Sequence, residues 1–173
     1  MVDFNNIENP LRPAVRAICL SEGGIPKRTV YAVRVSRWGL VGDGHNHAKH
    51  NRSEQAVCLQ DWELLRDLSR EGFSLNCGTI GENLTVENLQ VQKLTPGTIL
   101  RFSGGVTLEL TKERKPCYVL DSIDPRLKEV IAGRCGFYAR VLAGGVLTIR
   151  ETIDIGERPF SPSLSESADL AFR

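Results

Sequence analysis

The sequence predicts a mainly β, α+β fold with a few short helices, whose strands form a closed, barrel-like mixed sheet. First, about eight short runs alternate apolar with polar residues or gather β-branched ones, which is typical of strands. Second, Gly-, Pro- and Ser-containing turns separate these runs at hairpin-like spacing. This spacing favours a barrel-like or mixed sheet over a parallel βαβ fold. Third, no G-x-G-x-x-G sequence opens a helix after a strand, so dinucleotide binding is not indicated.

The predicted strands begin at residue 14. Residues 14–20 and 30–35 are joined by a Gly-Gly turn, which favours antiparallel neighbours. Residues 98–102 and 106–111 form a hairpin across a Ser-Gly-Gly turn. The remaining strands are expected at residues 56–59, at residues 84–86, at residues 136–142 and around residues 148–155.

Two helices are predicted between these strands. Asp61 is placed to cap a helix over residues 62–71, and Gly72 would end it. Asp124 and Pro125 would start a second helix, which ends at Gly133. The residues expected to face the core are Trp62, Leu64, Leu65, Leu68, Leu127, Val130 and Ile131.

The 173 residues are sufficient for a single domain, with a core over about residues 14–156, a polar segment at 1–13 and a polar tail at 157–173. The formal net charge of +1 gives no argument for binding nucleic acid or an anionic membrane. The first 13 residues lack the apolar core of a signal peptide, and no apolar run is long enough to span a bilayer. Five scattered cysteines without a CxxC pair favour reduced thiols, so we expect a cytoplasmic protein.

The most informative stretch is residues 111–117, TKERKPC, at the end of a predicted strand. Proline lacks the N–H needed for strand pairing, so Cys117 should lie at a strand-to-helix junction. The cations Lys112, Arg114 and Lys115 precede it, and cations near a thiol lower its pKa. Cys117 is therefore a candidate nucleophile, sulfur carrier or soft-metal ligand. The alternative is a small buried apolar residue of no chemical role.

A second stretch, residues 39–50, contains three glycines and all three histidines of the chain. His45, His47 and His50 have the spacing of a metal site, but Lys49 stands where an aspartate ligand would be expected and no further histidine is available. The other interpretation is a loop that binds an anionic or heterocyclic ligand through Asp43, His45 and backbone N–H groups. An exposed loop without a ligand is the third.

Glu82 and Asn83 lie between a glycine and the start of a predicted strand. Their side chains could project from a bent backbone into a site. Glycine and asparagine are also the common residues of ordinary turns, so this stretch alone does not distinguish a site from a turn.

Together, four stretches in this order resemble the MOSC domain family, named for the C-terminal domain of molybdenum cofactor sulfurase, in its small stand-alone bacterial form. The stretches are residues 39–45 (GLVGDGH), 81–85 (GENLT), 111–117 (TKERKPC) and 136–145 (GFYARVLAGG), with His50, Arg52 and residues 56–59 in addition. The resemblance covers about residues 14–156 and implies a MOSC-type β-barrel with a reactive cysteine.

The resemblance further implies that Cys117 is a molybdenum ligand or a persulfide carrier. Arg114, with Lys112 or Lys115, would hold the anionic tail of the molybdenum cofactor (molybdopterin). Asp43, His45, Glu82 and Asn83 would line the pocket. Molybdenum favours thiolate ligands, and guanidinium groups suit phosphate, so the residue types agree with these roles.

Three functions follow as hypotheses. The first is an oxidoreductase that reduces N-hydroxylated or N-oxide small molecules at a molybdenum centre on Cys117. Because the chain carries no flavin, haem or iron–sulfur signature, this enzyme needs a redox partner protein. The second is a sulfur carrier that accepts a persulfide on Cys117 from a cysteine desulfurase. The third is a binding module without chemistry, which depends on Arg114 and not on Cys117.

Overall fold

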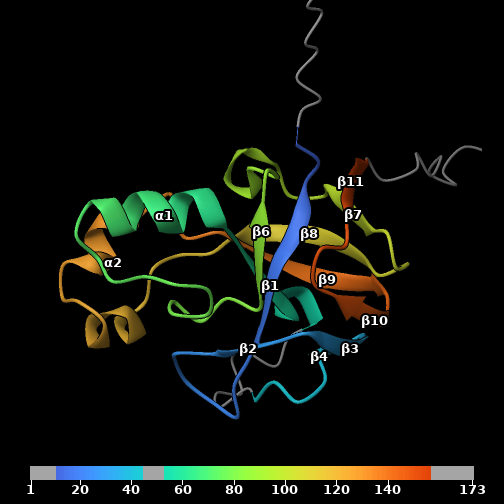
Figure 1. Ribbon diagram of the computed structural model, residues 1–173, viewed down its shortest axis with the longest axis horizontal. Helices are drawn as coiled ribbons and strands as arrows, with labels where there is room; N and C mark the ends of the chain where they lie inside the picture. Colours follow the sequence, from blue (N-terminus) through green and yellow to red (C-terminus); the bar gives the residue numbers. More distant parts are fainter. Residues whose placement is uncertain (1–10, 45–52, 157–173) are drawn as a thin grey trace, which may run out of the picture.

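The computed structural model describes residues 11–44 and 53–156. Figure 1 shows a central sheet with the two α-helices together on one side. Its elements, in chain order, are β1 (Ala14–Leu20), β2 (Arg28–Val30), β3 (Ala32–Ser36), β4 (Gly39–Leu40), η1 (Ser53–Gln55), β5 (Val57–Asp61), α1 (Trp62–Arg70), β6 (Leu84–Glu87), η2 (Val91–Lys93), β7 (Ile99–Phe102), β8 (Thr107–Glu113), η3 (Tyr118–Ser122), α2 (Leu127–Val130), β9 (Phe137–Ala143), β10 (Gly145–Thr148) and β11 (Ile153–Gly156).

The strands form two sheets. The larger one has eight strands in the order β11-β7-β8-β9-β5-β6-β1-β2, and the smaller one has the order β10-β3-β4. All strand pairs are antiparallel except β5 and β6, which run parallel. The mainly β, mixed-sheet prediction is therefore confirmed, and so is the predicted β7–β8 hairpin.

The predicted closure into a barrel is not confirmed. The eight-stranded sheet has two end strands, β11 and β2, which do not pair with each other. Its ends do approach, because Ala14 forms an isolated antiparallel bridge with Thr152. The N–H of Val15 also donates to the carbonyl of Glu151 at 2.9 Å. These contacts join β1 to the residues before β11 without completing a strand ladder.

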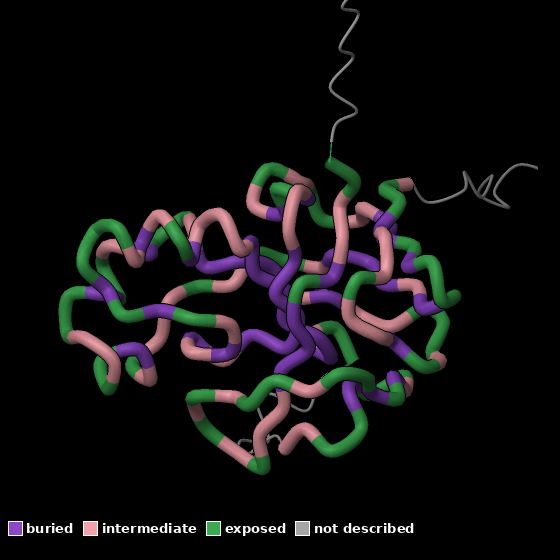
Figure 2. Tube along the Cα trace, in the orientation of Figure 1, coloured by how far each residue is buried: buried purple, intermediate pink, exposed green. Residues whose placement is uncertain are grey.

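Apolar side chains form two clusters. The sheet cluster lies within the β-strands and includes Ile18, Leu59, Leu84 and Phe137, all fully buried. The helix cluster includes Leu65 and Leu68 of α1 with further buried residues, namely Phe73, Leu75, Ile80, Leu120, Leu127, Ile131 and Cys135. Figure 2 shows the buried segments concentrated along the central strands. No helix in the described part of the chain is long and apolar enough to cross a membrane.

Several local predictions need correction. The expected strand at residues 30–35 is two strands, since Tyr31 separates β2, which pairs with β1, from β3, which pairs with β10 and β4. The expected strand around residues 148–155 is likewise divided into β10 and β11, which belong to different sheets. Leu64 is partly exposed, so the buried face of α1 is formed by Leu65 and Leu68.

Asp61 precedes α1, as predicted, but its side chain makes no capping hydrogen bond to the helix. Its carboxylate accepts instead from the backbone N–H groups of Val91 (2.8 Å) and Gln92 (3.2 Å) in η2. Asp61 therefore connects two elements that are distant in the sequence.

Candidate functional site: a cavity lined by Cys117

A cavity of about 150 Å³ lies where several chain segments meet. The turn after β1, the residues after β4 and the residue before β6 form one part of its wall. The start of β5, strand β9 and the segment after β8 form the rest. Its lining residues with polar or reactive side chains are Ser21, Lys27, Asp43, Gln55, Cys58, Asn83, Arg114, Cys117 and Tyr138. Segments that are far apart in the sequence therefore contribute to a single site.

Cys117 lies at the predicted strand-to-helix junction. β8 ends at Glu113, and η3 starts at Tyr118. Cys117 has extended backbone angles, φ −130° and ψ 170°, and its carbonyl accepts a hydrogen bond from the N–H of Leu120 at 3.1 Å. Its side chain is half-buried, lines the cavity and forms no disulfide. A half-buried free thiol in a cavity wall is accessible to a ligand.

The three cations before Cys117 differ in their positions. Arg114 lines the cavity, whereas Lys112 and Lys115 are exposed and do not. The Lys112 ammonium lies 5.8 Å from the centre of the Tyr138 ring, in cation–π range. Of these three, only Arg114 is placed to contact a ligand inside the cavity.

The guanidinium of Arg114 is buried. Its Nη2 donates to the carbonyl of Ile80 at 2.5 Å, while Nη1 has no hydrogen-bond partner among the described residues. Burial opposes its charge, but the neighbouring Cys58, Cys135, Tyr138 and Glu82 raise the pKa of Arg114, so it stays protonated. A buried cation with an unused donor is a candidate anion-binding group.

Asp43 is held in a buried hydrogen-bond network, with its side chain 1% exposed. Its Oδ2 accepts from Lys27 Nζ at 2.5 Å and from Asn83 Nδ2 at 2.8 Å. Its Oδ1 accepts from the N–H of Ser21 at 3.0 Å. The network therefore ties the residues after β4 to the turn after β1 and to the start of β6.

Asn83 and Glu82 have different surroundings. Asn83 lines the cavity, and its Oδ1 also accepts from the N–H of Cys58 at 3.0 Å. Glu82 is fully buried and does not line the cavity. Its Oε1 accepts from Gly78 N–H (2.6 Å) and Thr85 Oγ1 (2.8 Å), and its Oε2 has no partner among the described residues. Burial raises the pKa of Glu82, which favours its protonated form.

The predicted site residue His45 lies outside the described residues, as do His47 and His50. The metal-site interpretation of this loop is therefore untested. Among the described residues, no group of three or more His, Cys, Asp or Glu side chains is placed to hold a metal ion.

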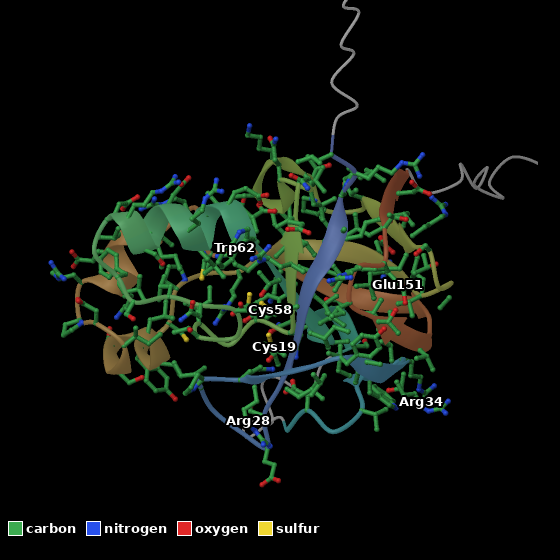
Figure 3. The ribbon with its side chains drawn as sticks, viewed as in Figure 1. Cys19, Arg28, Arg34, Cys58, Trp62 and Glu151 are labelled. Carbon is green, nitrogen blue, oxygen red and sulfur yellow. The ribbon has the colours of Figure 1, made fainter. Side chains whose placement is uncertain are left out.

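Sequence reasoning missed five of these polar or reactive cavity residues, namely Ser21, Lys27, Gln55, Cys58 and Tyr138. Cys58 lies in the predicted strand at residues 56–59 and was assigned no role in a site, but it is 5% exposed and lines the cavity beside Arg114. Burial raises the pKa of the Cys58 thiol, and burial raises the pKa of Tyr138 to about 12. Figure 3 shows Cys58 near the centre of the molecule. The partner of Lys27 is 16 residues away, so no local motif marks it.

Comparisons with known proteins show the family and the fold of this chain. The family model described as "MOSC domain" matches residues 46–157. A Gibberella moniliformis protein named "Reductase" is 33% identical over 135 residues, which cover 72% of this chain and 24% of that protein. YflK of Bacillus subtilis is 33% identical over 138 residues, covering 72% of this chain and 59% of its own. The chain thus spans less than two thirds of either relative.

Solved structures share the fold. The YuaD protein of Bacillus subtilis superposes with a TM-score of 0.73 at 16% identity, covering 86% of this chain and 98% of that one. YiiM of Geobacillus stearothermophilus superposes with a TM-score of 0.70 at 25% identity, covering 84% of this chain and 76% of that one. YiiM of Escherichia coli superposes with a TM-score of 0.68 at 21% identity, covering 88% of this chain and 73% of that one. Since the family model matches well over half of the chain, this protein belongs to the MOSC domain family.

Proposed function

We propose that this protein is an oxidoreductase that binds the molybdenum cofactor and reduces N-hydroxylated or N-oxide small molecules. The observation that carries the proposal is a half-buried free thiol, Cys117, in the wall of a cavity. The same cavity is lined by Arg114, whose Nη1 is buried. The relative named "Reductase" supports the same class of reaction.

The residues present fit this cofactor in their chemistry. Cys117 would be the metal ligand, because molybdenum favours thiolates. Arg114 Nη1, which is buried without a partner among the described residues, would donate to an anionic oxygen of the cofactor. Lys112 and Lys115 are exposed and do not line the cavity, so they would add positive charge outside it. When bound, the cofactor supplies a metal centre that exchanges two electrons with the substrate.

The other cavity residues would orient the substrate. The ammonium of Lys27 uses one N–H on Asp43 and lines the cavity, so its other N–H bonds can point to a substrate oxygen. Asn83 and Ser21 fix the Asp43 carboxylate, which keeps Lys27 in place. The net reaction joins R–NHOH, two electrons and two protons to give R–NH₂ and water. The electrons come from a separate redox partner protein.

The test combines metal analysis with activity. Protein purified without oxidants should contain molybdenum, and with dithionite-reduced methyl viologen it should reduce an aryl hydroxylamine to the amine. Cys117→Ser should lose both metal and turnover. Cys77→Ser is the matched control, because Cys77 is also partly exposed but does not line the cavity. A Cys117→Ser protein that keeps metal and turnover would defeat the proposal.

A sulfur carrier is the second candidate. It is favoured by one observation: within the described residues, Cys117 is the one cysteine that is both partly exposed and part of the cavity wall. Such a thiol can receive a persulfide from a cysteine desulfurase. Incubation with desulfurase and free cysteine should then add one sulfur atom to Cys117, detected by mass spectrometry of its peptide. If the desulfurase leaves Cys117 unmodified, this candidate fails.

A further inference from the structure

Three exposed arginines and several exposed apolar residues are spread along β2, the small sheet and the turn between β3 and β4. We call this surface the arginine face; it consists of Arg28, Tyr31, Arg34, Arg37, Trp38, Val41 and Val146, all exposed. Figure 3 shows Arg28 and Arg34 along the lower edge of the view, away from the two α-helices. Tyr31 is 72% exposed, so its ring is available to a partner.

Strand register places the centre of this face on one side of the small sheet. Side chains alternate along β3, so Val33 and Val35 are buried while Arg34 between them points outward. Arg34 pairs with Val146 of β10, and its carbonyl accepts from the N–H of Val41 at 2.9 Å. The exposed side chains of Val146, Arg34 and Val41 therefore lie side by side across three neighbouring chain segments.

Among the described residues, the three arginines of this face have no carboxylate partner. Residues 23–42 contain Lys27, Arg28, Arg34 and Arg37 but no Asp or Glu. Lys27 pairs with Asp43, whereas no carboxylate of the described residues lies within ion-pair distance of the other three. Elsewhere, five arginines are paired with carboxylates, namely Arg16, Arg70, Arg126, Arg134 and Arg140. Arg37 instead stacks 4.4 Å from the centre of the Trp38 ring.

The face adjoins the cavity. Arg28 directly follows Lys27, and Val41 precedes Asp43 by two residues, and both Lys27 and Asp43 line the cavity wall. A protein that covered the arginine face would therefore reach the neighbourhood of the reactive site. Exposed arginine and aromatic side chains beside apolar ones are typical of protein interfaces.

We propose that the arginine face docks an acidic electron-transfer protein. This inference rests on the proposed reductase function, which requires two electrons per N–O bond from outside the chain. The reduced partner loses two electrons, solvent supplies two protons, and water leaves with the substrate oxygen. Nucleic acid fits less well, because three arginines fall short of the roughly 6–10 phosphate contacts that make such binding strongly salt-dependent. Exposed Val41 and Val146 favour a protein partner.

The test uses reduced flavodoxin, a small acidic carrier, as the partner probe. One variant carries Arg28→Gln, Arg34→Gln and Arg37→Gln. The matched control carries Arg66→Gln, Arg70→Gln and Lys128→Gln, three exposed cations on the helical side. Turnover is measured with flavodoxin and with reduced methyl viologen, which needs no docking. Binding to flavodoxin is measured separately at low and high salt, whatever the molybdenum content.

The arginine-face variant should lose about tenfold or more in flavodoxin affinity and in flavodoxin-driven kcat/KM, with viologen turnover unchanged. The control should behave like the parent protein. Equal behaviour of both variants in the binding assay overturns the inference. So does loss of single-stranded oligonucleotide binding in the arginine-face variant with flavodoxin binding intact. Absence of viologen turnover in the parent rejects the reductase function, while the binding assay still decides the docking surface.

Discussion

The two apolar clusters differ in what lies beside them. The helix cluster, built around Leu65 and Leu68, is bordered by exposed ion pairs such as Arg70 with Asp67. The sheet cluster is bordered on one side by buried polar groups, including Asp43, Glu82 and Arg114. Ile80 connects the two regions, because its side chain belongs to the helix cluster while its carbonyl accepts from Arg114.

The stability of the fold and the properties of the cavity therefore depend on different contacts. Burying apolar surface stabilises the helical region, whereas buried polar groups cost free energy unless they are hydrogen-bonded. The cavity lies among these buried polar groups, beside the large sheet. Mutations in the helical region should therefore change stability and leave the site unaltered, while mutations at the cavity should change both.

Leu68→Ala should have the largest effect. Leu68 is fully buried, and its truncation should lower the free energy of unfolding by about 2–5 kcal/mol. The native-state alkylation rate of Cys117 should stay within about twofold, because the cavity does not contact Leu68. Urea unfolding and iodoacetamide kinetics measure the two quantities. A large change in Cys117 reactivity under native conditions would contradict the separation.

Asn83→Ala should have the second largest effect and lower the free energy of unfolding by about 1–3 kcal/mol. The change removes the acceptor of the Cys58 N–H and one donor to Asp43. Unlike Leu68→Ala, it should also change the alkylation rate of Cys117, since Asn83 forms part of the same cavity wall. Asn76→Ala is the control. Because Asn76 is exposed, this substitution should change the free energy of unfolding by less than about 0.5 kcal/mol. Equal effects of the two changes would argue against the network.

Alkaline pH should weaken the fold through the buried thiols. Burial raises the pKa of Cys19 from 9.0 to about 12 and that of Cys135 to about 11. Above pH 9.0 the unfolded chain releases these protons and the native protein keeps them, so stability falls as pH rises toward those values. Between about pH 9 and 10 each thiol should contribute a loss of about 1 kcal/mol. Urea unfolding midpoints at these two pH values, measured for the parent protein and for Cys19→Ala, test this loss. If the midpoint falls equally in both proteins, Cys19 does not contribute to it.

The smallest effect is expected for Arg70→Gln on α1. The Arg70–Asp67 pair is exposed, and such pairs contribute about 0–1 kcal/mol. Thermal unfolding should detect a change of less than about 0.5 kcal/mol that shrinks further in high salt. A larger loss would show that the helical region depends on charge as well as on apolar burial.

Local patterns predicted most of the fold. Alternation located β1, β7, β8 and β9, and glycines marked their turns. The division at Tyr31 was not predictable, because residues on both sides have similar strand propensity and differ only in the strands they pair with. The parallel pairing of β5 with β6 was missed for the same reason, since register between distant segments leaves no local signal.

The residues that line the cavity were predicted in part. Cys117, Arg114, Asp43 and Asn83 all line the cavity, as the motifs indicated, whereas Glu82 is buried outside it and Lys112 and Lys115 are exposed. The sequence shows charged residues near Cys117 but not which of them point inward. That depends on strand register and on the buried carbonyl of Ile80, which fixes Arg114.

The parallel β5–β6 pair has a practical consequence for labelling the protein. Both strands begin at the same edge, where Asn83 N–H donates to the carbonyl of Cys58 at 2.8 Å and the cavity wall is formed. The connection between them includes α1, whose far end lies well outside the central sheet (Figure 1). Glu71 and Gly72 at this end are exposed, and Gly72 has open space around it. An epitope or a fluorescent protein inserted there should leave the cavity intact, giving a labelled protein whose Cys117 reactivity can be compared with that of the parent.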